Sequence, residues 1–321
     1  MILVYYMKLD KNNVYYYNLG MNLVKDSVKL IDLAEPGRKI EYAGRVCYKS
    51  QDKISDDSYE RFIKGIINRG HTSVLEHERK MFAVTEEYWL KFWQHLFARS
   101  DKSRYFNITS SEDGNYVYVS GNIRAWYEFT KEESDDFKED REIISAFLAK
   151  DYPYIFNSNE AIRLPTDVVF YGAEAEKVCN DLSKHKAYTF EIVGSRSFTH
   201  QIVRHRTLSF SQESQRYCNY TAGKFGSSIR VIGSEVPDGA GHLLNQLEEL
   251  YFDLIEKGAK PEEARQILPN CTASTIVVTG TLEDWKKFLH LRVDEHAQRE
   301  IREIAINIMH DLHLTKSDIG L

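Results

Sequence analysis

The stretch RHRTLSFSQESQRY, residues 204–217, gathers basic and hydroxyl side chains in a chain of net charge −6: Arg204, His205, Arg206, Arg216, Ser209, Ser211 and Ser214. Arginine presents a rigid fork of donors that matches phosphate and carboxylate groups. Residues two apart do not share a helix face, so Arg204 and Arg206 point in different directions if a helix ends here, and they could hold two anionic groups or two parts of one cofactor. The alternative is a solvated loop with two surface arginines. A lone RxR is common, but the whole pattern RHR-x7-S-x-R is much more specific.

Composition narrows the class of ligand. The 321 residues include 42 Lys and Arg against 48 Asp and Glu, and they fit one large or two modest domains. An acidic chain is not an obvious general nucleic-acid binder, so the local basic cluster indicates a small anionic ligand.

No apolar run is long enough to span a membrane, and the N-terminus lacks the pattern of a signal peptide. The widely spaced cysteines, without a CxxC, argue against zinc and disulfides and favour a cytoplasmic protein.

Hydrophobic periodicity predicts alternating strands and helices after a Tyr- and Asn-rich extension at 1–22. Strands are predicted at 28–34, 81–84, 115–121, 187–194 and 273–280. Helices are predicted at 55–70, 86–99, 132–150, 173–185, 197–205, 242–258, 261–268, 282–292 and 294–313. In the first helix, Ser55 is expected to cap the start and Gly70 to end it. The alternation indicates an α/β or α+β fold and leaves the topology open.

Two further motifs carry polar side chains. GHTSVLEH (70–77) places His71, Ser73, Glu76 and His77 at a helix end. Its histidines are six apart, unlike the HExxH pattern of zinc sites, so no metal is expected there; a capped turn is the alternative. Arg265 in EARQILPN and Arg292 in FLHLR each lie in apolar surroundings. A partly buried arginine needs an anionic partner, which is a ligand or an internal carboxylate.

One weak internal repeat is present. VSGNIRAWYEF (119–129) is similar to VTGTLEDWKKF (278–288), and each is typical of a strand, a glycine turn and a helix. The repeat is either a common strand-to-helix junction or a duplicated turn that binds a ligand.

Five motifs, in order, resemble those of flavin-dependent thymidylate synthases: GRVCYKS (44–50), GHTSVLEH, GSRSFTHQIVRHRTLSFSQESQRY (194–217), ARQILPN and FLHLR…EHAQREIR. The resemblance covers roughly 28–84 and 187–312. It implies a family domain at 23–321, interrupted by an insertion at about 85–186. It also implies an α/β (α+β) fold with a central sheet flanked by helices, assembled as a homotetramer with active sites between subunits. The implied reaction methylates dUMP to dTMP with FAD, NADPH and methylenetetrahydrofolate.

The resemblance also assigns site residues. The dUMP contacts would be Gln201, Arg204, Gln212, Ser214, Arg216, Arg265 and Arg292. The FAD contacts would be Ser73, Arg204, His205, Arg206, Gln212 and Lys287. Arg292 would be catalytic, favouring ionisation of the uracil at N3. No Pro-Cys-His occurs in the chain, so no cysteine nucleophile is expected.

The chain departs from the family at one turn. Where the family commonly has GNxRxW, this chain has GTLEDW, with Thr281 and Glu283. The expected Asn and Arg occur instead as Asn122 and Arg124 in GNIRAW (121–126), inside the insertion. We therefore expect this turn to help shape the ligand site through a helix start and an Arg–phosphate contact.

Two other functions remain open. A catalytically silent relative that binds flavin or nucleotide is the first, because Glu283 or the insertion could block FAD. The second is a nucleic-acid-binding protein that uses the basic stretch, against which the net charge of −6 argues.

Overall fold

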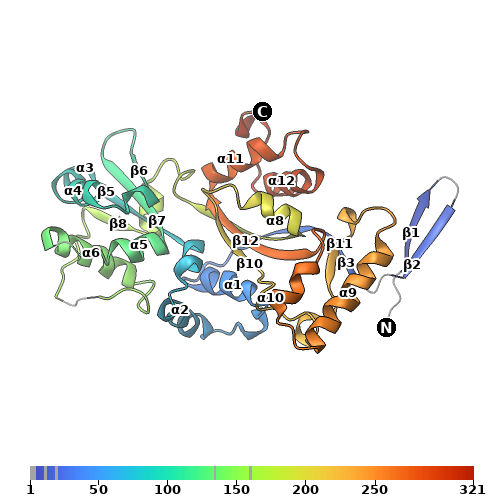
Figure 1. Cartoon of the computed structure of the whole chain (residues 1–321). Helices are drawn as coiled ribbons and strands as arrows, with labels where there is room; N and C mark the ends of the chain where they lie inside the picture. The colour runs from blue at the N-terminus through green and yellow to red at the C-terminus, as the bar shows by residue number, and fades with distance from the viewer. Residues whose placement is uncertain (1–4, 11–12, 19–20, 134, 159–160) are drawn as a thin grey trace.

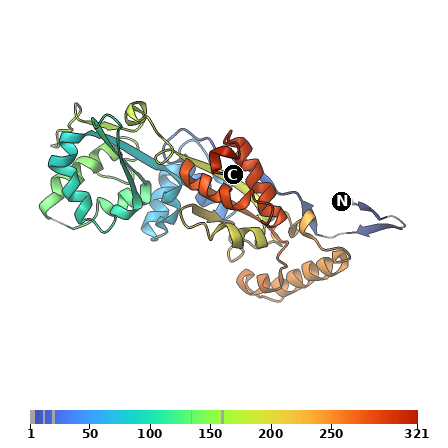
Figure 2. The same ribbon diagram turned by 90° about the horizontal axis from the view of Figure 1, so that it is seen from above.

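The computed structural model describes residues 5–10, 13–18, 21–133, 135–158 and 161–321. Two four-stranded antiparallel sheets dominate it, one built from both ends of the chain and one from its middle (Figures 1 and 2). The mixed helix-and-strand class is confirmed, and the structure has a second sheet beside the central sheet that was expected. Of the predicted extension, residues 1–4, 11–12 and 19–20 lie outside the described residues. The rest forms an antiparallel hairpin, β1 (Tyr5–Asp10) with β2 (Asn13–Asn18).

The sheet built from both ends of the chain, called here the core sheet, is buried on both faces along its central strand of residues 273–281. Its strand order is β10 (Ser209–Gln212), β12 (Ala273–Thr281), β9 (Ala187–Ser195) and β4 (Ser27–Leu30). On β12, Ile276 and Val278 pack toward the helices on one face, while Val277 packs against Ala43 and Val46 on the other. This alternation is the period of two expected of a strand. The core sheet lies between two helical layers.

Most helices of the core half cover this sheet. The covering helices are α1 (Arg38–Cys47), α8 (Arg196–Ile202), α11 (Leu282–Arg292) and α12 (Arg299–Asp311). A smaller cluster lies to one side around the parallel pair β3 (Asn22–Val24) and β11 (Arg230–Ile232), with α9 (Gly241–Glu256) and α10 (Pro261–Ala264). α2 (Ser58–Asn68) and the 3₁₀ helix η2 (Thr72–His77) lead from the core half into the middle of the chain.

The second sheet, called here the insertion sheet, has the order β6 (Phe106–Ser110), β7 (Tyr116–Asn122), β5 (Arg79–Thr85) and β8 (Val169–Tyr171). One continuous helix follows β5: α3 (Glu86–Tyr88), a π-helical turn (Trp89–Trp93) and α4 (Gln94–Arg99). The other helices are α5 (Ile123–Phe129), α6 (Lys138–Ala149) and α7 (Ala173–Val178). Phe82 packs edge-on against Trp93 and Trp126, with ring centroids 5.5 and 5.0 Å away.

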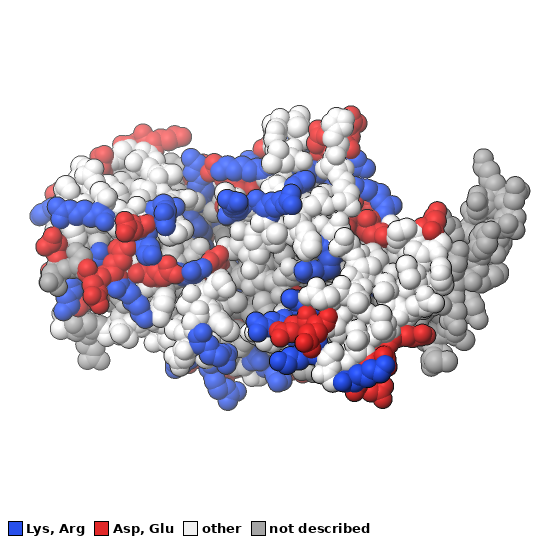
Figure 3. All heavy atoms as spheres, in the orientation of Figure 1, with Lys and Arg blue, Asp and Glu red and all other residues white. Residues whose placement is uncertain are grey.

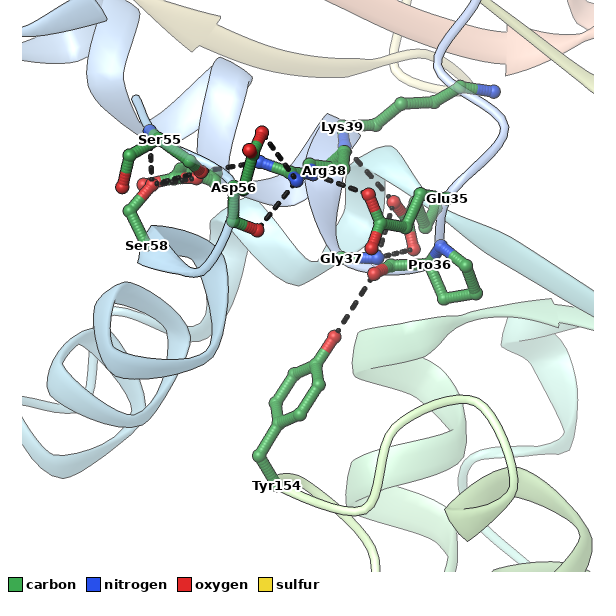
Figure 4. Close-up of polar contacts among 11 residues, drawn as sticks. Glu35, Pro36, Gly37, Arg38, Lys39, Ser55, Asp56, Ser58 and Tyr154 are labelled. Atoms are coloured by element: carbon green, nitrogen blue, oxygen red, sulfur yellow. Dashed lines mark hydrogen bonds and ion pairs between the residues drawn. The ribbon is translucent and has the colours of Figure 1, made fainter. Parts of the chain in front are cut away.

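Side chains from the two halves meet at the loop before α1 (Figure 4). Arg38 donates to Glu35 at 2.7 Å and to the carbonyls of Ser55 and Asp56 at 2.6 Å each, which joins the starts of α1 and α2. From the insertion, the Tyr154 hydroxyl donates to the carbonyl of Pro36 at 3.3 Å. The insertion is therefore anchored to the helix that carries the GRVCYKS motif.

Several predicted helices are shorter than expected, and local side-chain bonds explain two of them. The helix predicted at 173–185 ends at Val178, and the one predicted at 294–313 begins at Arg299. Asp181 accepts from the amide of Ser183 at 2.8 Å, and Asp294 accepts from that of His296 at 2.8 Å. Such turns compete with the helix for the same backbone groups.

The remaining differences are smaller. The helix predicted at 55–70 begins at Ser58, so Ser55 is not its cap, while Gly70 ends it with the expected positive φ of 73°. The prediction missed α1 and β10; β10 lies inside the basic stretch that sequence reasoning treated as a loop. Both copies of the weak repeat form strand-to-helix junctions, β7 to α5 and β12 to α11.

Candidate functional site

The basic stretch forms a turn after α8, the edge strand β10 and a loop that returns to α1. The Ser214 amide donates to the carbonyl of Cys47 at 3.0 Å, which joins this loop to the GRVCYKS motif. The side chain of Gln212 donates through Nε2 to Ser274 Oγ at 3.0 Å, on the neighbouring strand β12. Two of the residues predicted to contact dUMP are thus held by one backbone and one side-chain hydrogen bond within the core half.

Arg292 and His205 lie against each other at the end of α11. Arg292 Nε donates to His205 Nε2 at 3.0 Å, and the His205 ring packs edge-on against Phe288 at 4.9 Å. Burial, together with the charge of Arg292, lowers the pKa of His205 to about 4. His205 is therefore neutral at pH 7 and accepts through Nε2. The structure brings together the FLHLR and RHR motifs, which are far apart in the sequence.

The other predicted dUMP residues are distributed over three elements. Gln201, in α8, donates to the side chain of Gln298 at the start of α12. Arg216 Nε donates to Glu262 at 2.6 Å, and Arg265 follows directly after α10. Arg204 is exposed in the turn after α8. An anionic ligand at Arg216 would have to displace an ion pair that is open to solvent.

A buried carboxylate, Glu213, was missed by sequence reasoning. Its side chain is fully buried, and it accepts from the Tyr220 hydroxyl at 2.8 Å and from Arg230 at 3.0 Å, with Lys49 Nζ at 3.3 Å. A buried charge needs partners of this kind. Glu213 therefore anchors the loop on which Gln212 and Ser214 lie. The signal in the sequence is a single acidic residue within an otherwise basic stretch.

The predicted FAD residues do not form one cluster. Ser73 is exposed on η2, and Lys287 pairs with Glu283 at 3.2 Å on α11. Arg206 instead lines a cavity of about 410 Å³, together with Arg104, Asn122, Arg124 and residues of the insertion and core halves. Lys287 is not among the residues that line this cavity.

The GNIRAW turn lines this cavity, but the side chains of Asn122 and Arg124 already bind other groups of the chain. Asn122 Oδ1 accepts from the amide of Ala125 at 2.8 Å, and Arg124 pairs with Glu76 and Glu128 at 2.8 Å each. The expectation that the turn offers free amides and a free arginine was therefore wrong in detail. In the core copy, Thr281 caps α11 in the same manner, accepting from the amide of Asp284.

A second cavity, of about 260 Å³, lies where β5 and β9 begin, and His77, Glu78 and His185 line it. Glu78 is buried and accepts from the amide of Gly37 and from the Tyr152 hydroxyl, at 2.9 and 2.6 Å. Glu78 therefore joins the loop before α1 to the insertion.

The surface and the polar clusters limit other kinds of site. Basic and acidic side chains are interspersed over the insertion, at the left of Figure 3, instead of forming a field of one sign. Within the described ranges, no group of three His, Cys, Asp or Glu side chains could hold a metal ion. Among the helices of those same ranges, none has the length and apolar character needed to cross a bilayer.

Solved structures resemble the chain only loosely. The UMP/dUMP methylase PolB from Streptomyces cacaoi, bound with 5-Br UMP, is 16% identical with a TM-score of 0.38, covering 91% of each chain. Thymidylate synthase X from Helicobacter pylori, with FAD and dUMP, is 21% identical with a TM-score of 0.36. It covers 43% of this chain and 76% of its own.

Curated relatives named flavin-dependent thymidylate synthase match more closely in sequence. The protein of Corynebacterium glutamicum is 37% identical over 152 residues, 41% of this chain and 60% of that protein. The protein of Pyrococcus abyssi is 34% identical over 151 residues, 45% of this chain and 59% of that protein. The chain thus matches about 60% of the length of these relatives.

The model of the thymidylate synthase complementing protein family matches residues 29–99 and 180–314. The match includes each of the five motifs that resemble those of flavin-dependent thymidylate synthases, and its interruption fits an insertion in the middle of the chain. The chain belongs to the thymidylate synthase complementing protein family.

Proposed function

We propose that the chain is a flavin-dependent thymidylate synthase, which methylates dUMP at C5 to give dTMP. Methylenetetrahydrofolate would supply the carbon and NADPH-reduced FAD the hydride. Membership of the family and the names of the curated relatives support this proposal. The observation that carries it is the bond from Arg292 to His205, because it places a fixed cation beside the RHR motif.

Arg292 is the proposed catalytic residue. Uracil C5 is a poor nucleophile, and a positioned arginine can stabilise negative charge that develops on the ring. His205 accepts from Nε of Arg292, which fixes the guanidinium. Within the described part of the chain, the terminal nitrogens of Arg292 have no hydrogen-bond partner, so they can donate to a pyrimidine carbonyl.

The remaining proposed dUMP residues would orient the nucleotide and hold its phosphate. Gln212 and Ser214 are fixed by Ser274 and Cys47 and would present polar groups to the sugar and phosphate. Gln201, Arg204, Arg216 and Arg265 complete the proposed set, with the guanidinium groups neutralising the phosphate. Arg216 would exchange Glu262 for the ligand on binding.

FAD is the proposed cofactor, and when bound it would supply the redox chemistry. The fit rests on the cavity that Arg206 lines, because its volume of about 410 Å³ is in the range of ligand sites. Ser73, Arg204, His205, Arg206 and Gln212 are the proposed contacts, and of these five Arg206 alone lines this cavity. We retain Lys287 only as a peripheral contact, because it pairs with Glu283. Assembly into a homotetramer is part of the same proposal.

One experiment separates this function from that of a silent relative. Purified protein with FAD is assayed for NADPH-dependent conversion of dUMP and methylenetetrahydrofolate to dTMP. Product formation supports the enzyme. A flavin absorbance spectrum without product would indicate a relative that binds flavin and does not turn over. Neither spectrum nor product would indicate that FAD is blocked, as expected if Glu283, a carboxylate at the family's arginine position, repels the flavin phosphate.

A further inference from the structure

The core sheet and the insertion sheet have the same connectivity. In each, a central strand leads into a helix, an edge strand follows, and a second central strand leads into another helix. These elements are β9, α8, β10, β12 and α11 in the core half, and β5, α3–α4, β6, β7 and α5 in the insertion. The remaining edge strands, β4 and β8, both pair antiparallel with the first central strand. The halves differ in two respects. β4 precedes β9 along the chain whereas β8 follows β5, and the link from the outer strand to the second central strand is long in the core half and a tight hairpin in the insertion.

The two sheets also share a register. Thr281 is opposite Ala187 in the core sheet, and Asn122 is opposite Arg79 in the insertion sheet. Four residues beyond each cap, a buried tryptophan donates to the second residue of the first central strand. Trp285 Nε1 donates to the carbonyl of Tyr188 at 3.1 Å, and Trp126 Nε1 donates to that of Lys80 at 3.2 Å.

Two buried histidines occupy equivalent positions. His77 and His185 each lie two residues before their central strand, β5 and β9. His77 Nδ1 and Nε2 contact Thr279 and Ser211 of the core sheet, at 2.8 and 2.9 Å. His185 Nδ1 and Nε2 contact Ser120 and Thr109 of the insertion sheet, both at 2.8 Å.

These contacts are reciprocal. Each histidine lies just before a strand of one sheet and contacts the other sheet. In both cases Nδ1 contacts the second central strand and Nε2 contacts the outer strand. Thr279 and Ser120 both lie two residues before a helix cap, and Ser211 and Thr109 both lie on the outer strand. A common strand-to-helix junction does not require such agreement in register, cap, tryptophan and histidine. The insertion is therefore a structural repeat of the core half. The histidine that precedes each sheet is held by the sheet of the other half.

The repeat places one arginine from each half in the same cavity. Leu208 packs so closely against Gly280 that a Cβ at residue 280 would clash with it. Phe106 packs against Gly121 in the same way. Arg206 and Arg104 each lie two residues before these equivalent side chains. Both are exposed, and both line the cavity of about 410 Å³ between the halves.

The charges in this cavity favour an anion. Of the carboxylates that line it, Glu76 and Glu128 pair with Arg124, and Asp284 accepts from the amide and hydroxyl of Thr281. Arg79, Arg104 and Arg206 also line the cavity, and within the described part of the chain no carboxylate is within 4.0 Å of their nitrogens. Burial lowers the pKa of Arg79 only to about 10, so Arg79 keeps its charge at neutral pH. Four arginines and three carboxylates line the cavity, which leaves one positive charge in excess. The guanidinium groups without a paired carboxylate can donate to the oxygens of a phosphate.

We propose that this cavity is a single-chain binding site for a nucleotide pyrophosphate, with Arg206 from the core half and Arg104 and Arg79 from the inserted repeat. The proposal rests on the proposed function in that FAD carries such a group. It goes further by assigning half of the site to the insertion of the same chain. A second copy of the chain is then not needed to complete this site.

The first test measures binding of FAD and of ADP, which shares the pyrophosphate, by titration calorimetry. Arg104→Ala and Arg206→Ala should each raise the Kd for both probes by roughly tenfold to a hundredfold, the effect of losing a charged hydrogen bond. Arg99→Ala is the matched control, because Arg99 is an exposed arginine of the insertion whose partner is Asp136. It should leave both Kd values unchanged. Unchanged affinity in Arg104→Ala, beside a loss in Arg206→Ala, would overturn the role of the repeat.

The second test separates one chain from two. Chains carrying Arg104→Ala and chains carrying Arg206→Ala are co-expressed with different tags, and mixed assemblies are purified. A single-chain site predicts no binding at wild-type affinity, because every site lacks one arginine. Recovery of a fraction of wild-type sites would show that the arginines come from different chains and would overturn the proposal.

The two probes also separate this inference from the flavin proposal. Binding of ADP that depends on Arg104, without binding of FAD, would keep the pyrophosphate site and remove the flavin. Failure of both probes to bind the wild-type chain would overturn the site itself.

Discussion

His205 Nε2 accepts a hydrogen bond from Nε of Arg292 at 3.0 Å. The two residues are on different elements, the turn after α8 and the end of α11, and the core sheet brings them together. A neutral imidazole can accept this bond, whereas an imidazolium cannot. The depressed pKa of His205, about 4, is therefore part of how Arg292 is held.

Arg292→Ala is expected to abolish dTMP formation while FAD stays bound. Loss of a positioned charge of this kind costs about 3 kcal/mol or more of transition-state stabilisation. Turnover and flavin absorbance are measured on the same preparation. Arg302→Ala is the control, since Arg302 lies on α12 and donates to the carbonyl of Glu295. Near-normal turnover in Arg292→Ala would remove it from the catalytic role.

Acid should destabilise the protein partly through its buried histidines. Burial lowers the pKa of His77 to about 3, and burial, with a contribution from the charge of Arg79, lowers that of His185 to about 4. Both values are below the usual value of about 6.5, so the unfolded state binds more protons between these limits. This stability is present above pH 6.5 and is lost as the pH falls toward 4.

Unfolding by urea at pH 7.5, 6 and 5 measures this effect. His77→Gln should reduce the loss of stability between pH 7.5 and 5 relative to wild type, because it removes one titrating group and keeps a polar partner for Thr279 and Ser211. Each unit of pKa difference corresponds to about 1.4 kcal/mol. Parallel stability curves for the two proteins would contradict the assignment.

No cysteine should be essential for activity. Burial raises the pKa of the Cys47 and Cys271 thiols, and Cys218 is buried, so a reactive thiolate is disfavoured at neutral pH. Single replacements of Cys47, Cys179, Cys218 and Cys271 by Ser or Ala should retain dTMP formation apart from packing losses. A variant that folds and binds dUMP and FAD but has no turnover would contradict this.

The sequence predicted local elements well where the hydrophobic period was strong. Helix 242–258 and strand 273–280 agree closely with α9 and β12. The edge strand β10 was missed because its residues alternate serine with Phe210 and Gln212, and its pairing with β12 depends on residues far along the chain. The predicted ends of two helices were wrong near Asp181 and Asp294. At each position the aspartate side chain accepts from a backbone amide and so competes with the helix.

The sequence predicted which residues form the candidate site, but it did not predict which of them contact one another. The motifs indicated Arg292 and His205 separately, but the bond between them depends on the packing of α11 against the turn after α8. The repeat was visible over eleven positions, as 119–129 and 278–288. Its full extent was not, because His77 and His185, the strongest evidence for it, lie in segments with little sequence similarity.

The last prediction concerns Glu213, which lies fully buried between Lys49, Arg230 and Tyr220. Glu213→Gln keeps the shape but leaves two cations without a counter-charge, and breaking a buried pair costs about 3–5 kcal/mol. The loop that carries Gln212 and Ser214 would loosen, so dUMP binding should weaken along with stability. Asp253→Asn is the matched control, because its pair with Lys257 is open to solvent, lies away from the proposed dUMP residues and contributes at most about 1 kcal/mol. Urea unfolding and dUMP titration of both variants decide the matter: equal losses in the two would show that burial of Glu213 does not anchor the loop.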